Sequence, residues 1–103
     1  MVGNYLLVRV FGNSMQPTLV HGDFLLIKKS QEFSIGDLVV VDHENSKLIK
    51  RIVDENQSQI WLSGDNIRES NDSRKFGWVA KEKIIGRVIL RYWPKLKINF
   101  KVH

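Results

Sequence analysis

One serine and one lysine in this chain have surroundings that suit nucleophilic catalysis. Ser14 follows a glycine and an asparagine and lies three residues before Pro17, so it stands in a turn after an apolar run. Lys50 lies in another apolar run, where a period of two places it between Leu48 and Ile52 on one strand face. A lysine held among apolar side chains loses hydration of its charged form, which lowers its pKa. Its neutral amine can then take the proton of a serine hydroxyl, which becomes the nucleophile.

Each of these two residues also has an ordinary structural explanation. A serine in a turn is most often a surface or capping residue. A lysine on a strand can pack its stem and extend its ammonium into water. Arg51 is a weaker candidate base, because a guanidinium stays protonated at every accessible pH. A Ser–His–Asp triad built on His21 or His43 is a competing mechanism for the serine.

Apolar residues recur with a period of two along most of the chain, so the expected elements are strands. The expected strands cover residues 5–10, 24–27, 38–41, 48–53, 60–62, 76–79, 84–93 and 95–102. Gly-Asp pairs at 22–23 and 36–37 are turns, each of which opens an apolar strand. Residues 80–83 are expected to form a helical turn, and Gly86 to mark a β-bulge. These elements predict a mainly β fold: a small antiparallel folded sheet or partly open barrel with at most one or two short helical turns.

The composition fits one compact domain covering residues 1–103. Hydrophobic residues make up 43% of the chain and charged residues 26%, as in ordinary folded proteins. The absence of cysteine excludes disulfides, thiolate metal sites and a cysteine nucleophile. No apolar run is long enough to span a bilayer or to form the core of a signal peptide. We therefore expect a cytoplasmic protein without a membrane anchor.

Positive charge gathers at the C-terminal end of the chain. After Glu82 there is no acidic residue, whereas six basic residues follow: Lys83, Arg87, Arg91, Lys95, Lys97 and Lys101. Tyr92 and Trp93 lie among them, and aromatic side chains interleaved with basic ones suit base stacking and phosphate contact. A small basic β-barrel module that binds nucleic acid or an anionic surface is therefore an alternative function. A solvated basic strand face is the ordinary explanation of the same pattern.

Residues 63–75 form a polar stretch with too few apolar side chains to hold itself in place. Asp72 and Arg74 are natural partners for an ion pair there, worth about 0 to 1 kcal/mol at the surface and more if partly buried. The stretch is either a flexible polar loop or a loop ordered by such side-chain contacts.

A series of short motifs in this chain resembles the ordered motifs of signal peptidase I and its Ser–Lys peptidase relatives. The series is Ser14–Leu19 (SMQPTL), 22–23 (GD), 36–39 (GDLV), 50–52 (KRI), 64–66 (GDN), 70–74 (SNDSR), 76–77 (FG) and 86–87 (GR). The motifs follow the family order and, with their flanking residues, span 11–94. The resemblance implies a fold of the signal peptidase catalytic-core type.

The resemblance implies a role for each matching residue. Ser14 would be the nucleophile, with its backbone N–H as an oxyanion donor, and Lys50 would be the general base. Ser70 resembles the family serine that orients the lysine amine. Supporting roles fall to Asp72 and Arg74 as a structural pair and to Asp65 and Asn66 as a loop-ordering element. No metal or cofactor is implied.

The implied substrate is a protein precursor with an N-terminal leader, bound as an extended strand beside an exposed sheet edge. Met15 and Leu19 are candidates for lining its pockets, and no nucleic acid is expected as a partner. Some family members have a serine two residues before the nucleophile as a second oxyanion donor. Gly12 stands there in this chain, so Asn13 or a water would have to supply that hydrogen bond.

Two further departures concern the size of the chain. Only thirteen residues separate Lys50 from Gly64, so the large inserted domain of the bacterial enzymes is not expected, and neither is a membrane anchor. This pattern resembles small cytoplasmic maturation proteases, among them those that process nickel-type superoxide dismutase. Self-cleaving repressors of the SOS type share the Ser–Lys arrangement, but their DNA-binding domain and internal cleavage site are not visible in this sequence.

Overall fold

The computed structural model describes residues 3–101, which form a single antiparallel sheet of seven strands. The strands are β1 (Tyr5–Arg9), β2 (Phe24–Lys28), β3 (Leu38–His43), β4 (Ser46–Glu55), β5 (Gln59–Ser63), β6 (Val79–Ala80) and β7 (Ile84–Trp93). Their order in the sheet is β1-β2-β7-β3-β4-β5-β6, and the sheet is not closed into a barrel. The predicted mainly β, antiparallel fold is confirmed.

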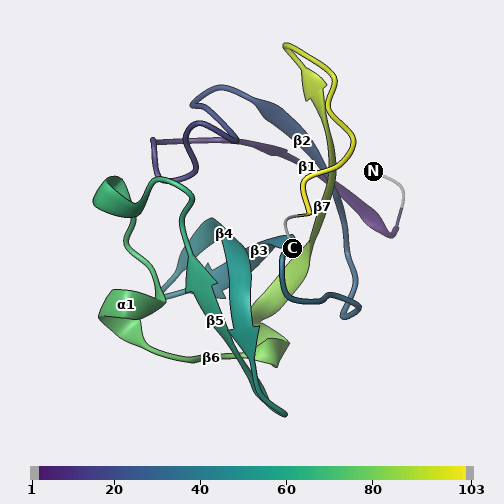
Figure 1. The fold of residues 1–103 in the computed structure, drawn as a ribbon. Helices are drawn as coiled ribbons and strands as arrows, with labels where there is room; N and C mark the ends of the chain where they lie inside the picture. The colour runs from purple at the N-terminus through teal and green to yellow at the C-terminus, as the bar shows by residue number, and fades with distance from the viewer. Residues whose placement is uncertain (1–2, 102–103) are drawn as a thin grey trace.

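The long strand β7 joins the two halves of the sheet. Its first half pairs with β3 and its second half with β2, and Arg87 has a partner on each side, Val39 and Lys28. Figure 1 shows β7 passing from the group formed by β3, β4 and β5 to the group formed by β1 and β2. The register against β3 shifts next to Gly86, where the sequence predicts a bulge.

Strand β3 is buried on both of its faces. Leu38 and Val40 belong to one hydrophobic cluster, whereas Val39 and Val41 belong to a second. The first cluster also contains Val10, Met15, Leu19, Leu25, Ile27, Val88 and Phe100, and the second also contains Ile52, Ile60, Leu62, Val79 and Ile84. A strand covered on two sides reads as a continuous apolar run, as it does here. Each such side chain contributes about 1.5–3 kcal/mol of transfer free energy.

Both predicted Gly-Asp turns are present, and the aspartates stabilise them. A side-chain oxygen of Asp23 accepts a hydrogen bond from the backbone N–H of Val20 at 2.9 Å, and Asp37 accepts one from Ser34 at 2.9 Å. The preceding glycine has a positive φ in each turn, a conformation that other residues adopt at a cost. The turns therefore start β2 and β3 at defined positions.

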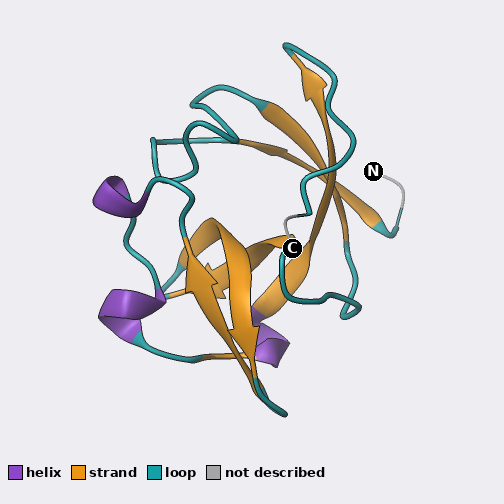
Figure 2. Ribbon diagram, viewed as in Figure 1, coloured by secondary structure: helices purple, strands orange, loops and turns teal. Residues whose placement is uncertain are grey.

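Within residues 3–101 there are three short helical turns, where the sequence predicts at most one or two, with one at 80–83. The turn predicted at 80–83 is η2 (Lys81–Lys83). The other two, η1 (Ile67–Glu69) and α1 (Ser73–Phe76), both lie in the connection from β5 to β6 (Figure 2). The extended segment predicted from Phe76 is wrong at its start. Asp72 caps α1 by accepting from the N–H of Arg74 at 3.1 Å, and a single capped turn leaves no apolar period in the sequence.

The strand predicted at 95–102 is wrong. The tail pairs with β7 through one bridge, between Arg91 and Lys97, and Leu96 and Ile98 are about 70% exposed (68% and 70%). Phe100 alone among the described alternating apolar residues enters the core, and Val102 lies outside the described residues. Alternation predicts a strand only where a neighbouring strand is available to pair with it. In the part of the chain that the structure covers, no helix is long and apolar enough to cross a membrane.

Candidate active site

The turn that carries Ser14 is anchored in the core on either side of its proline. Met15 and Leu19 are 2% and 0% exposed, and the N–H of Leu19 donates to the carbonyl of Met15 at 3.0 Å. Ser14 itself stays partly exposed. Met15 lines the cleft next to Ser14, but Leu19 does not, because its side chain is fully enclosed by the core. Leu19 is thus a core residue here, and its contact with substrate stays a prediction.

Lys50 is buried on strand β4 with only 3% of its surface exposed. It pairs with Val39 across the sheet, and Ile52 next to it on the same face is also buried. The ammonium therefore does not extend into water. Burial lowers the pKa of Lys50, the negative charge of Asp72 acts in the opposite direction, and the positive charge of Arg74 lowers it further. The net effect is a lysine that gives up its proton more easily than a free one.

Ser14 and Lys50 line the same cleft, which has a volume of about 310 Å³. The rest of its wall comes from Val8 to Phe11, Met15, Val40 and Lys47 to Ile49. Among the described residues the Ser14 hydroxyl forms no hydrogen bond. Ser14 and Lys50 therefore line one cleft without a hydrogen bond between them. Catalytic hydrogen bonds are often absent before substrate is bound.

A polar chain leads from the Lys50 amine into the loop after β5. Lys50 Nζ donates to Ser70 Oγ at 3.2 Å, and Ser70 in turn hydrogen-bonds Asp72. Burial alone would raise the pKa of Asp72, but hydrogen bonds from Arg74, the Gly64 N–H and Ser70 outweigh it and hold the pKa far below its usual range. The predicted Asp72–Arg74 ion pair is present, with Nη2 and Oδ2 2.9 Å apart.

Gly64 allows the loop after β5 to approach the Ser14 turn. A Cβ atom at this position would lie 2.5 Å from the Ser70 Cβ and 2.6 Å from the Ser14 carbonyl oxygen, and closer still to the Ser70 hydroxyl. Real Cβ atoms do not come so near to other heavy atoms. The absence of a side chain at Gly64 therefore allows Ser70, which accepts from Lys50, to lie close to the turn that carries Ser14.

The next two residues, Asp65 and Asn66, bind the Ser14 turn directly. The backbone N–H of Asn66 donates to the Ser14 carbonyl at 2.8 Å, and its side-chain amide donates to the Asn13 carbonyl at 3.0 Å. Asp65 accepts from the Thr18 hydroxyl. Burial would raise the pKa of Asp65, but the hydrogen bonds from Arg51 and Thr18 and the charge of Arg51 together hold it below its usual value.

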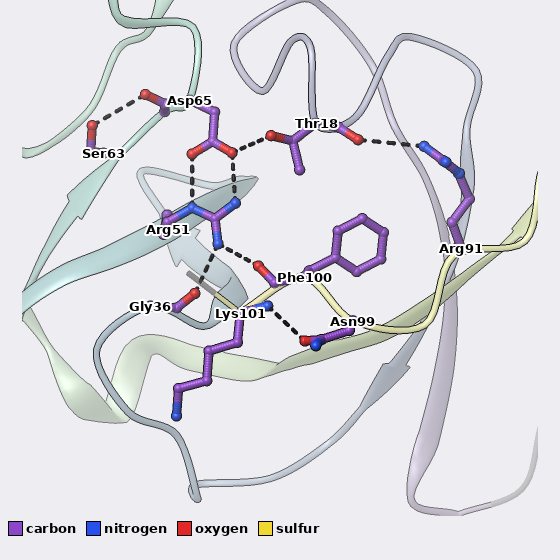
Figure 3. A network of polar contacts seen from close by, with 10 residues as sticks. Thr18, Gly36, Arg51, Ser63, Asp65, Arg91, Asn99, Phe100 and Lys101 are labelled. Atoms are coloured by element: carbon purple, nitrogen blue, oxygen red, sulfur yellow. Dashed lines mark hydrogen bonds and ion pairs between the residues drawn. The ribbon is translucent and has the colours of Figure 1, made fainter. Parts of the chain in front are cut away.

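Arg51 is the weaker candidate base, and in the structure its guanidinium is bound to other groups. Its guanidinium forms a two-bond ion pair with Asp65, at 2.9 and 2.7 Å, and donates to the carbonyls of Gly36 and Phe100 at 2.8 and 2.6 Å (Figure 3). Sequence reasoning missed this role and that of Thr18. An arginine within an apolar strand next to a candidate base was the available signal, since a guanidinium in such a place needs several acceptors.

The two histidines of the competing triad have other contacts. His21 Nδ1 accepts a hydrogen bond from the Gly12 N–H at 3.0 Å, and the His43 ring lies 4.1 Å from that of Phe76. Neither histidine hydrogen-bonds Ser14 within residues 3–101. In the same range, no three His, Asp or Glu side chains come together as metal ligands would.

Residues 2–89 match the family model described as Peptidase S24-like. The chain belongs to the Peptidase S24-like family. Two similar relatives of this S24-like chain are mitochondrial inner membrane protease subunit 1 from Xenopus tropicalis, at 33% identity, and from Schizosaccharomyces pombe, at 37%. Each alignment covers 81% of this chain, with 66% of the frog protein and 70% of the yeast protein. Signal peptidase IB from Staphylococcus aureus is 30% identical over 76% of this chain and 41% of that protein.

These relatives confirm the signal-peptidase resemblance that the motifs predict. The S24-like chain spans about two thirds of the length of the mitochondrial relatives and less than half of the staphylococcal one. Its membership supports a serine-type peptidase. The family match ends at residue 89, so the last fourteen residues of the chain lie outside it.

Proposed function

We propose that this chain is a serine endopeptidase in which Ser14 is the nucleophile and Lys50 the general base. One observation carries the proposal: Lys50 is 3% exposed, its amine donates to the Ser70 hydroxyl at 3.2 Å, and it lines the same cleft as Ser14. Burial lowers the pKa of the Lys50 amine, which increases the neutral fraction that can act as a base towards a hydroxyl.

The reaction proceeds in two halves. Lys50 takes the Ser14 proton while Oγ attacks the scissile carbonyl, and the resulting ammonium donates its proton to the leaving amine as the C–N bond breaks. The acyl group stays on Ser14 until Lys50 takes a proton from a water that attacks the ester carbonyl. As the ester bond breaks, the Lys50 ammonium returns this proton to Ser14 Oγ and the acid is released. The Ser14 backbone N–H is the proposed donor to the oxyanion in both halves. Asn13 is a candidate for the second donor.

An extended substrate segment fits beside β1. This strand is the last in the sheet on its side, and Val8, Val10 and Phe11 from it and the following turn line the cleft. A peptide added along an open strand edge obtains main-chain hydrogen bonds, while its alternate side chains enter the cleft. The substrate proposed here is a precursor protein with an N-terminal leader. Its identity as a nickel superoxide dismutase precursor, and a cytoplasmic location, stay predictions.

The direct test is cleavage of a candidate precursor by the purified protein, followed by intact-mass spectrometry to locate the cut. We expect Ser14→Ala and Lys50→Ala each to abolish cleavage. Matched controls are Ser58→Ala and Lys29→Ala, which remove an exposed serine and an exposed lysine outside the cleft. Full activity of either site variant would exclude the Ser–Lys mechanism.

The alternative function, a basic binding module, has its own test. Trp93 is 61% and Tyr92 41% exposed, but the basic strand face expected at Lys95 to Lys101 is not formed. We expect no saturable binding to a single-stranded oligonucleotide at low salt by fluorescence anisotropy. Salt-dependent binding that survives Ser14→Ala and weakens when Lys95 and Lys97 are changed to Gln would favour the module instead.

A further inference from the structure

The C-terminal tail, residues 94–101, contacts residues that support the turn carrying Ser14, although the two segments are far apart in the sequence. After its single bridge to β7, it crosses to the core and places Phe100 there, 5% exposed. The tail begins five residues beyond the segment that matches the family. The tail therefore lies outside the segment that matches the family.

The side chain of Phe100 packs into the same hydrophobic cluster as Met15 and Leu19. These two residues anchor the turn of Ser14, as described above. Ile98, two residues earlier in the tail, is 70% exposed. Phe100 is thus the residue through which the described part of the tail supports the turn by packing.

The carbonyl of Phe100 makes the second contact, with the buried guanidinium of Arg51. Nη1 of Arg51 donates to this carbonyl at 2.6 Å and to the Gly36 carbonyl at 2.8 Å, while Nε and Nη2 bind Asp65. The arginine side chain is 8% exposed. A guanidinium is planar, so the acceptors on its Nη1 side fix the direction in which its other two nitrogens hold the carboxylate. Figure 3 shows Arg51 between these acceptors.

Asp65 and the residue after it connect Arg51 to the turn that carries Ser14. Its carboxylate accepts from the Thr18 hydroxyl, and the next residue, Asn66, donates to the Ser14 carbonyl at 2.8 Å. Phe100 is therefore connected to the turn in two ways. One is apolar, through the core beneath Met15, and the other is polar, through Arg51 and Asp65.

We propose that the C-terminal tail, through Phe100, is a positioning element for Ser14. This inference rests on the proposed peptidase function for its kinetic consequence. Removing the Phe100 side chain loosens the packing under the turn and lets the tail carbonyl leave Arg51. Neither change touches Lys50 or Ser70. The expected result is a lower kcat with an unchanged KM and an unchanged midpoint in the pH–rate profile, because the base keeps its surroundings.

The first test needs no substrate. Amide hydrogen exchange by NMR is compared in the wild type, Phe100→Ala, Phe100→Leu and the exposed control Ile98→Ala. We expect Phe100→Ala to speed exchange of the Leu19 and Asn66 amides about tenfold, with the β3 amides of Val39 and Val41 unchanged. Leucine at position 100 should restore most of the protection. Unchanged exchange at Leu19 and Asn66, or an equal increase at all amides, would overturn the proposal.

The second test measures kcat and KM on a cleavable precursor at a temperature where every variant is folded by circular dichroism. Phe100→Ala should lower kcat about tenfold, and Ile98→Ala should match the wild type. Ser14→Ala is included so that the result that refutes the proposed peptidase function differs from the result that refutes the positioning role of Phe100. Cleavage that does not depend on Ser14 refutes the proposed function. Ser14-dependent cleavage with an unchanged kcat in Phe100→Ala, or a change in KM alone, refutes the positioning role.

Discussion

The amine of Lys50 donates a hydrogen bond to the hydroxyl of Ser70 at 3.2 Å, and the two residues are 3% and 7% exposed. A neutral amine has one lone pair, and committing an N–H to Ser70 directs that lone pair elsewhere. Ser70 is itself tied to Asp72, so its oxygen is held in place to accept. The arrangement supports a base that is both desolvated and oriented.

The first prediction concerns pH. Burial lowers the pKa of Lys50 below its ordinary 10.5, so kcat/KM should rise with pH along a single limb whose midpoint lies below that value. The charge of Asp72 opposes the shift, and Asp72→Asn should therefore move the midpoint to lower pH. A pH–rate profile of both proteins measures this. A rate that falls steadily from about pH 6 to about pH 9 would contradict Lys50 as the base.

The second prediction concerns the orientation of the base. Ser70→Ala removes the hydroxyl that accepts from Lys50, and the amine can then rotate away from Ser14. We expect kcat to fall about ten- to a hundredfold with little change in KM. Steady-state kinetics measures this, and Asn71→Ala, which changes the exposed neighbouring side chain, serves as the matched control. Equal kcat values for Ser70→Ala and the control would show that the hydroxyl does not orient the base.

The third prediction concerns the close approach at Gly64. Gly64→Ala places a methyl group 2.6 Å from the Ser14 carbonyl oxygen and forces the loop and the turn apart. Overpacking of this kind costs about 1–3 kcal/mol of unfolding free energy, and kcat should fall as Ser70 moves. Urea denaturation and kinetics measure the two effects. Gly3→Ala is the control, because a Cβ there meets nothing within 4 Å. Wild-type behaviour of Gly64→Ala would remove this spacing role.

The fourth prediction concerns acid stability. The pKa of Asp72 lies below its unfolded value of 3.8, so its contribution to stability is complete above that pH and is lost as the pH falls towards the folded pKa. Asp72→Asn leaves the buried Gly64 N–H and the Arg74 guanidinium without a charged acceptor. It should cost about 1–3 kcal/mol at neutral pH, and less than that well below pH 3.8. Denaturation curves at both pH values test this, and a cost that does not shrink in acid would contradict it.

Much of the sheet could be predicted from the sequence, because strand periodicity is local. The apolar run of β3 and the alternation around Lys50 both identify strands, and the Gly-Asp turns locate where two of them begin. The tail shows the limit of this reasoning. Its alternation from Lys95 to Lys101 is as regular as that of any strand, yet only the end of β7 is available to pair with it. The short helix α1 was missed because one capped turn has no period to detect.

The sequence by itself determined which chemical groups are present and in what order: a turn serine, a lysine among apolar neighbours, and a polar loop with a serine and an Asp–Arg pair. Only the tertiary structure decided whether Lys50 is shielded from water, because its burial depends on residues distant in the chain that cover it. It also decided that Ser70 reaches Lys50 across 20 residues and that Phe100 reaches Arg51 across 49. Desolvation and hydrogen-bond geometry arise from such long-range packing, and no local pattern in a sequence records them.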